Sequence, residues 1–85
     1  MASTFFSDIR PLFRDEDISC MTARGVKLGD ADWMCDARPG NGFEDHGNAR
    51  VVFSALSRGS MPPDRPWRQA QLNAYDAWMR DGFLK

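Results

Sequence analysis

The chain has 85 residues, is 42% hydrophobic, and carries 11 Lys and Arg residues against 12 Asp and Glu residues, for a formal net charge of −1. This length gives room for one small core, so residues 1–85 are expected to form a single domain, and the scattered cations argue against nucleic acid as a partner. No apolar stretch approaches the ~20 residues of a membrane span and no secretory signal opens the chain, so we expect a cytoplasmic protein without membrane contact.

The first predicted helix runs from about Ser7 to Arg14. Thr4 or Ser7 can cap its start, and its apolar residues share one face: Phe5, Ile9, Leu12 and Phe13. The acidic run 15–17 follows and is expected to be solvated. Residues 18–21 then predict a further turn of helix.

From Thr22 to about Glu44 the chain is rich in turn formers, among them Gly25, Gly29 and the run 39–42. Residues 30–35 predict one short helical turn that places Trp33 in the core. A stretch of more than about 15 residues with so little regular structure is uncommon in a compact domain, and often wraps or binds something.

The second clear helix is predicted from about Asp45 to Arg58, with Gly59 as its stop. Its apolar face comprises Ala49, Val52, Phe53 and Leu56. The segment 60–65 contains two prolines and is expected to be extended. The third helix opens at Pro66 and ends at Gly82, with a strong apolar period at Trp67, Ala70, Ala74, Tyr75, Trp78 and Met79. Since no alternating strand pattern of useful length occurs, the predicted class is all-α.

The remaining chemistry-bearing residues are two cysteines and one histidine. Cys20 and Cys35 match no zinc pattern, because two thiols and His46 leave a tetrahedral site one ligand short. We interpret them as buried or half-buried thiols, reduced in the cytosol and able to pair after export. His46 is interpreted as a capping or surface residue.

The order of these elements resembles the class I c-type cytochromes. The opening segment 5–13 is similar to the N-terminal helix that precedes their haem-attachment motif. The segment 59–63, with Met61, followed by a helix with Tyr75, Trp78 and Gly82, is similar to their distal-methionine segment and closing helix. The resemblance spans nearly the whole chain and implies a small three- to four-helix cytochrome c-like domain.

The attachment motif is where the sequence departs from this family. The cytochromes carry Cys-x-x-Cys-His, and the counterpart here is Asp17-Ile18-Ser19-Cys20-Met21. Only Cys20 keeps a thiol, and Met21 stands at the position of the proximal histidine. Haem iron is normally anchored by an imidazole or a thiolate. The resemblance therefore implies a domain without covalent haem, with vestigial haem-site positions at Asp17, Cys20, Met21 and Met61.

Loss of haem would leave a void that a small domain cannot tolerate, because cavities are costly. We expect aromatic side chains to fill it: Phe5, Phe13, Trp33, Phe43, Phe53, Trp67, Tyr75 and Trp78. In this interpretation Met21 and Met61 are flexible fillers. The alternative is a residual pocket that admits a ligand.

Three functional hypotheses follow. The first is a haem-free accessory or protein-interaction module that is not an enzyme and has no cofactor, because the sequence lacks a nucleophile elbow, a phosphate loop and a convergent catalytic set. Its partner would be an enzyme or subunit of the same pathway, docked on the Met61 segment by analogy with cytochromes. Exposed aromatics on a small core would also favour a homodimer.

The second hypothesis is copper binding. Cys20, Met21 and Met61 supply the soft ligands that Cu(I) prefers, and His46 could add an imidazole. The third keeps residual haem or redox chemistry, through non-covalent haem or a pair of Cys20 and Cys35. The acidic run 15–17 would disfavour the thiolate of Cys20.

Overall fold

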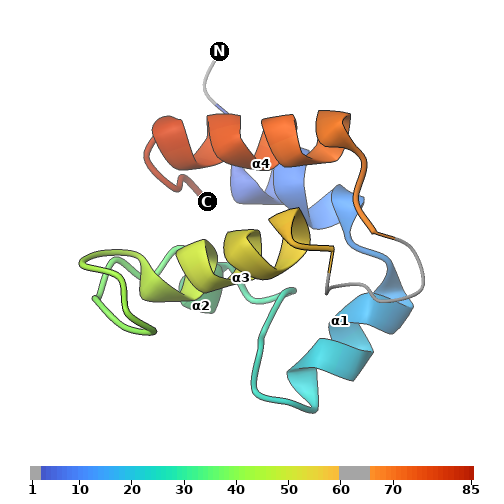
Figure 1. Ribbon diagram of the computed structural model, residues 1–85, viewed down its shortest axis with the longest axis horizontal. Helices are drawn as coiled ribbons and strands as arrows, with labels where there is room; N and C mark the ends of the chain where they lie inside the picture. The colour runs from blue at the N-terminus through green and yellow to red at the C-terminus, as the bar shows by residue number, and fades with distance from the viewer. Residues whose placement is uncertain (1–2, 60–65) are drawn as a thin grey trace.

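Helices make up the regular structure of the computed structural model, which describes residues 3–59 and 66–85 (Figure 1). In chain order the elements are η1 (Phe5–Ile9), η2 (Arg10–Leu12), α1 (Asp15–Thr22), α2 (Ala31–Met34), α3 (Gly47–Ser57) and α4 (Gln69–Arg80). Within these two segments there is no strand, and one isolated bridge joins Gly40 to Phe43. The all-α prediction is therefore confirmed. The predicted extended segment 60–65, with Met61, lies outside the described residues.

The N-terminal helix is built differently from the prediction. It starts at Phe5, where the Thr4 hydroxyl accepts a hydrogen bond from the Ser7 amide at 3.3 Å, and it ends at Leu12. It combines a π-helical turn with a 3-10 turn. Pro11 has no N–H to donate to the carbonyl four residues earlier, which is a physical reason for the departure from α geometry.

α1 is a separate helix of eight residues, longer than the single further turn that we predicted. Arg14 has an extended backbone conformation and separates α1 from η2. Asp15, Glu16 and Asp17 occupy the first turn of α1, where negative charges interact favourably with the helix dipole. The acidic run therefore starts a helix.

The other helices match the prediction except at their starts. α3 begins at Gly47, two residues later than predicted, because His46 adopts a left-handed φ of +46°. α4 begins at Gln69, where the Arg68 amide donates to the side chain of Gln71 at 2.8 Å. No described helix has the length and apolarity needed to cross a membrane.

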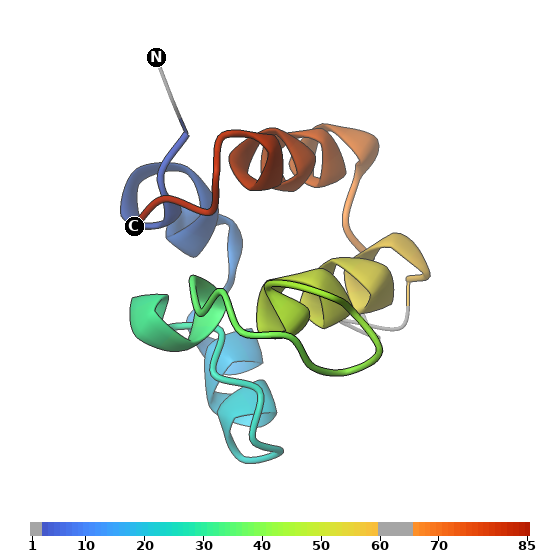
Figure 2. The same ribbon diagram turned by 90° about the vertical axis from the view of Figure 1, so that its left-hand side faces the viewer.

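α4 packs against both η1 and α3, while α2 packs against α3 (Figures 1 and 2). Figure 2 shows the C-terminus beside η1. The Phe5 amide donates to the Leu84 carbonyl at 2.8 Å, and the Phe6 amide donates to the Lys85 carbonyl at 3.1 Å. The Trp78 indole also donates to the Leu84 carbonyl, at 2.7 Å. The C-terminal segment thus joins η1 to α4.

The core of the described residues is rich in aromatic rings. Its buried hydrophobic members are Phe5, Ile9, Phe13, Leu28, Ala31, Met34, Ala49, Val52, Leu56, Trp67, Tyr75, Trp78 and Phe83. Five of the eight predicted core aromatics belong to it, whereas Trp33 and Phe53 are half-buried against it. Phe43 lies outside the cluster, and Ala70 is exposed.

The prediction that Trp33 anchors the core was wrong. Asp30 caps α2 by accepting hydrogen bonds from the amides of Asp32 and Trp33. This short helix turns Ala31 and Met34, three residues apart and on one face, toward the interior. Trp33 is left half-buried at the edge of the core.

Candidate functional site

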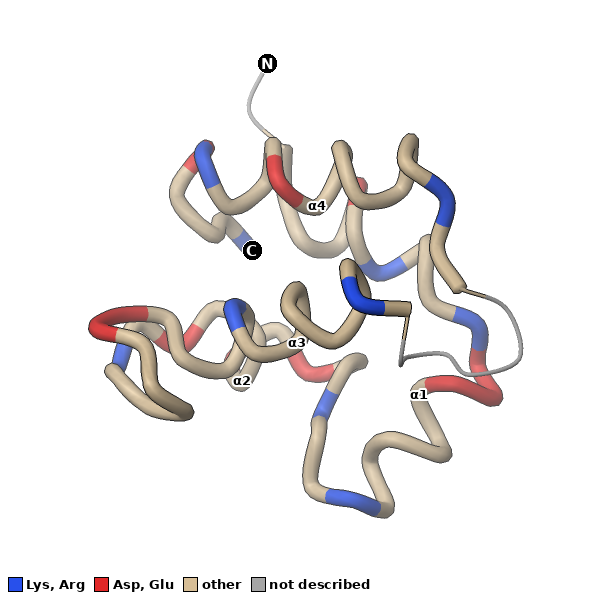
Figure 3. Tube along the Cα trace, viewed as in Figure 1, with Lys and Arg blue, Asp and Glu red and all other residues tan. Residues whose placement is uncertain are grey.

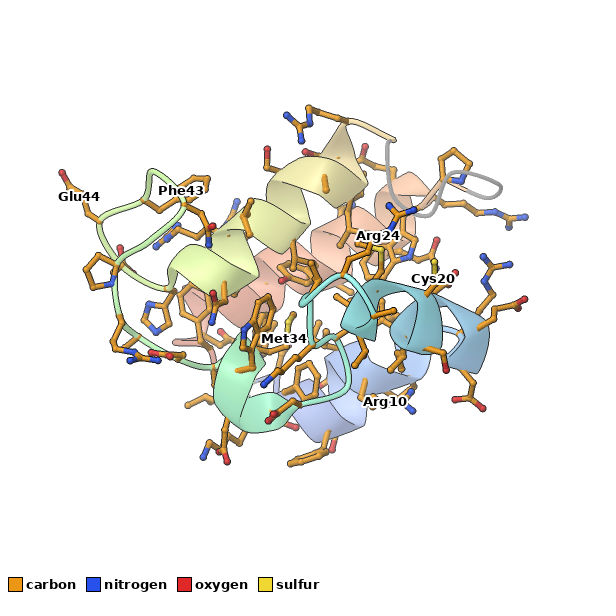
Figure 4. The ribbon with its side chains drawn as sticks, turned by 90° about the horizontal axis from the view of Figure 1, so that it is seen from below. Arg10, Cys20, Arg24, Met34, Phe43 and Glu44 are labelled. Atoms are coloured by element: carbon orange, nitrogen blue, oxygen red, sulfur yellow. The ribbon has the colours of Figure 1, made fainter. Side chains whose placement is uncertain are left out.

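Three of the four vestigial positions lie on α1, and the fourth, Met61, lies outside the described residues (Figure 4). Asp17 is only 11% exposed and forms a two-pronged ion pair with Arg14, whose Nε and Nη2 lie 2.8 and 2.7 Å from the two carboxylate oxygens. The prediction of a solvated acidic run was therefore wrong at Asp17. The ion pair of Asp17 with Arg14 is short, bidentate and partly buried, so it has better geometry than an ordinary surface ion pair.

Cys20 and Met21 face different surroundings. Successive residues of an α-helix point about 100° apart, and accordingly Cys20 is exposed whereas Met21 is half-buried. Met21 borders an apolar hollow of about 100 Å³ with four small side chains, Val26, Val51, Val52 and Ala55. A cavity of about 150 Å³ is enough for benzene, so this hollow suits one aliphatic side chain and is far too small for a porphyrin.

A chain of ring contacts runs through the interior. Phe13 contacts Trp67 with centroids 5.2 Å apart, and Trp67 in turn contacts Tyr75 at 6.1 Å. Trp78 continues the chain, 5.2 Å from Tyr75 and 5.3 Å from Phe83. These tilted and edge-to-face geometries are the favourable ones for aromatic pairs.

The hydroxyl of Tyr75 connects α4 to α3. It donates to the Ala49 carbonyl at 2.8 Å, which satisfies the one polar group of this buried side chain. Burial raises the pKa of Tyr75 well above its usual value, and the nearby Cys35 adds to the rise. The phenol therefore stays protonated and serves packing.

The cysteine predictions are partly correct. Cys35 is half-buried as expected, whereas Cys20 is exposed, and both are free thiols. Desolvation raises the pKa of Cys35, although Lys85 opposes the rise. A raised pKa keeps this thiol protonated and weakly nucleophilic at neutral pH.

The sequence reasoning missed a cluster at the start of α3. The imidazole of His46 stacks on the Phe83 ring, with centroids 3.7 Å apart and planes 6° apart. Its Nδ1 lies 2.7 Å from Oδ2 of Asp45, which also pairs with Arg50 at 3.1 Å. The Arg50 guanidinium lies 5.3 Å from the Phe83 centroid. The expectation of a capping or surface histidine is confirmed only in position: His46 is the N-cap residue of α3, but its side chain makes no capping hydrogen bond and is only 19% exposed.

The sequence offers one signal for this cluster, the glycine before Phe83. Phe83 follows Gly82, and we interpreted that glycine only as a stop for α4; Phe83 itself then takes a left-handed φ of +56° and folds back. His46 takes a left-handed φ as well, a conformation that non-glycine residues adopt rarely. The hydrogen bond from His46 and the ion pair with Arg50 lower the pKa of Asp45. The arrangement fastens the C-terminal segment to α3.

Two larger hollows open on the surface. One, of about 290 Å³, is lined by Phe43, Arg50, Phe53, Ser54, Ser57 and Met79. The other, of about 500 Å³, is lined by Arg10, Ile18, Thr22, Lys27, Gly29 and Asp30. Phe43, which we expected in the core, thus lines an open groove. Across the described segments, no three His, Cys, Asp or Glu side chains converge as a metal site would require.

Comparison with known proteins finds no matching family model, no matching curated protein and no matching solved structure. The cytochrome resemblance therefore rests on the sequence pattern alone.

Proposed function

We propose that this chain is a haem-free cytochrome c-like accessory or protein-interaction module with no catalysis of its own. The observation that carries the proposal is the surroundings of the vestigial positions. Where the cytochromes have a first cysteine, Asp17 pairs with Arg14. Where they have a proximal histidine, Met21 borders a hollow of about 100 Å³. Both positions have an ordinary structural use without a porphyrin.

The aromatic interior supports the same proposal. The rings from Phe13 to Phe83 form a continuous set of contacts, and Trp67, Tyr75 and Trp78 at its middle are all buried. In a cytochrome-like scaffold, these side chains would take the volume of the porphyrin. Filling it is necessary because an empty cavity of that size would cost more than a small domain can supply.

The single histidine of the sequence also fits a module without catalysis. His46 has one face covered by Phe83 and its Nδ1 held by Asp45. This use of the imidazole is structural: it connects the C-terminal segment to the start of α3.

An absorption spectrum of protein isolated from its native host tests the haem-free part of the proposal. We expect no Soret band, because Cys20, the one thiol that the attachment motif keeps, is exposed, and the hollow that the described residues form beside Met21 is too small for a porphyrin. The same preparation treated with alkaline pyridine and reductant checks for small amounts of haem. A stoichiometric Soret band would contradict the proposal and favour the residual haem alternative.

Cross-linking in the native host tests the interaction part. A tagged chain is expected to recover one partner in defined stoichiometry, an enzyme or a subunit of the same pathway. The matched control is the same tag on a variant unfolded by Trp78→Asp, which places a charge in the buried core. Recovery of the same proteins by both baits, or of none, would contradict an interaction module.

A further inference from the structure

The apolar hollow beside Met21 is formed by α1, the turn that follows α1, and α3. Met21 comes from α1, Val26 from the following turn, and the remaining wall is the α3 stripe with Val51, Val52 and Ala55. The amides of Arg24 and Val26 both donate to the Met21 carbonyl, at 3.0 and 2.9 Å. Backbone hydrogen bonds therefore fix this wall in advance, which reduces the ordering cost of binding.

Two arginines lie about one turn beyond residues that line the hollow. Arg24 is three residues after Met21 and donates its amide to the Met21 carbonyl, while Arg58, the C-cap residue of α3, is three residues after Ala55 and seven after Val51. Figure 3 shows basic segments after both helices, and Figure 4 shows Arg24 near Cys20. Neither arginine lines the hollow itself, but these spacings place both cations at the edge of its apolar floor, which we call the basic rim.

The charge of this rim is uncompensated within the described segments. Most arginines there pair with a carboxylate of their own chain: Arg10, Arg14, Arg38, Arg50 and Arg80. Arg24 and Arg58 are exposed and make no such ion pair. Exposed cations beside an apolar floor complement a surface segment that combines negative charge with one apolar side chain.

We propose that this hollow receives one aliphatic side chain, of the size of Leu or Ile, from an acidic segment of a partner protein. The inference rests on the proposed function, because it names the docking surface and the partner chemistry of the interaction module. The volume of about 100 Å³ limits the occupant to one aliphatic side chain. Arg24 and Arg58 would favour acidic residues on either side of that side chain in the partner segment. Arginine at a helix C-terminus also offsets the helix dipole, so the test must separate binding from stability.

The test is a titration of the chain, followed by NMR of its Met, Val and Ala methyl groups. The probe is a blocked peptide, Asp-Glu-Leu-Asp-Glu, compared with Asp-Glu-Ser-Asp-Glu and Lys-Arg-Leu-Lys-Arg. We expect saturable shifts at the methyl groups of Met21, Val26 and Ala55 with the first peptide. Affinity should fall about tenfold or more when Leu is replaced by Ser, since one buried aliphatic side chain is lost.

Matched variants separate the floor from the rim. Ala55→Leu fills the hollow and should abolish the shifts, whereas Ala70→Leu, at an exposed position of α4, should not. The double variant Arg24→Glu, Arg58→Glu should abolish binding of the acidic peptide, whereas Arg68→Glu, at an exposed arginine that does not line the hollow, should leave most of it. Circular dichroism of each variant confirms that it is folded.

Several outcomes would overturn the inference: no saturable shifts, equal shifts with the Ser peptide, shifts elsewhere on the molecule, or unaltered binding by folded Ala55→Leu. Two further outcomes distinguish a failure of this docking surface from a failure of the proposed function. A native partner whose capture is unaffected by Ala55→Leu and by the double arginine variant would overturn this surface and leave the module intact. Peptide binding at the hollow without any native partner would support the surface and count against the module.

Discussion

At the residue scale, the absence of a side chain at Gly47 allows a loop to lie directly against the start of α3. A Cβ at Gly47 would lie 2.5 Å from the carbonyl oxygen of Gly40 and 2.7 Å from its amide nitrogen. Both are backbone atoms that cannot rotate away, because the Gly47 amide donates to the Arg38 carbonyl and holds the loop in place. We expect Gly47→Ala to lower the free energy of unfolding by roughly 2–4 kcal/mol.

The matched control for this prediction is Gly40→Ala. A Cβ at Gly40 would meet nothing within 4 Å, so its effect should stay within about 0.5 kcal/mol. Urea unfolding followed by tryptophan fluorescence measures both. Equal midpoints for the two variants would show that the loop yields and that the close approach is not required.

Asp45 makes stability depend on pH. Its pKa is lowered below 3.8, first by the hydrogen bond from His46 and then by Arg50. A carboxyl whose pKa is lower in the folded chain contributes stability above its unfolded pKa, and loses it as the pH falls through the folded value. The penalty of Asp45→Asn, measured as the shift in urea midpoint, should therefore be present at pH 6 and shrink as the pH falls below 3.8 toward the lowered pKa of the folded chain.

Asp36→Asn is the comparison for Asp45→Asn. The Asp36 pKa is also lowered, chiefly by hydrogen bonds from Arg38, but this pair lies within one loop and joins no other element. Its midpoint shift at pH 6 should be the smaller one. A penalty for Asp45→Asn that is the same at pH 6 and pH 3 would contradict the electrostatic explanation.

At the element scale, the helices whose apolar residues recur every three or four positions were predicted within a few residues. The α3 face Ala49, Val52 and Leu56 is buried as predicted. The errors fall where backbone geometry overrides periodicity. Pro11 redirects the first helix, and His46 delays the start of α3 by a left-handed φ. Such local geometry depends on tertiary contacts that a sequence pattern does not contain.

The C-terminal segment after α4 is the element that sequence reasoning undervalued. The Phe83 ring is 7% exposed, stacks on His46 and meets the edge of Trp78. We expect Phe83→Ala to destabilise the fold by about 3–5 kcal/mol, the range for a buried aromatic residue. Thermal unfolding measures the loss, and hydrogen exchange at the Phe5 amide, which donates to the Leu84 carbonyl, reports whether the segment detaches.

Leu84→Ala is the control for this segment. Its side chain is 40% exposed, while its carbonyl, which accepts from Phe5 and Trp78, is kept. The expected loss is below about 1 kcal/mol. A small effect of Phe83→Ala, comparable to that of Leu84→Ala, would show that the segment does not hold η1 against α4.

At the scale of the whole molecule, composition and periodicity were sufficient for the all-α class and for most of the aromatic core. The site was harder to predict. A motif comparison locates Asp17 and Met21 in the sequence, but the Arg14 pair and the hollow lined by Val26 and Ala55 depend on how α1 meets α3. The cluster around His46 likewise needs segments 37 residues apart to meet, as His46 and Phe83 do.

The copper alternative makes a prediction about the whole molecule, because its ligands would have to come together from α1 and from the segment with Met61. Cys20 is exposed while the neighbouring Met21 faces the apolar hollow, so the two sulfurs diverge. We expect any Cu(I) uptake, measured by competition with a chromophoric chelator, to fall with Cys20→Ser and to be unchanged by Met21→Leu or Met61→Leu. A thioether adds to the affinity of a copper site at Cys20 only if it binds the same ion as that thiolate. One equivalent of tightly bound Cu(I), lost in both methionine variants, would contradict this expectation and establish a copper-binding protein.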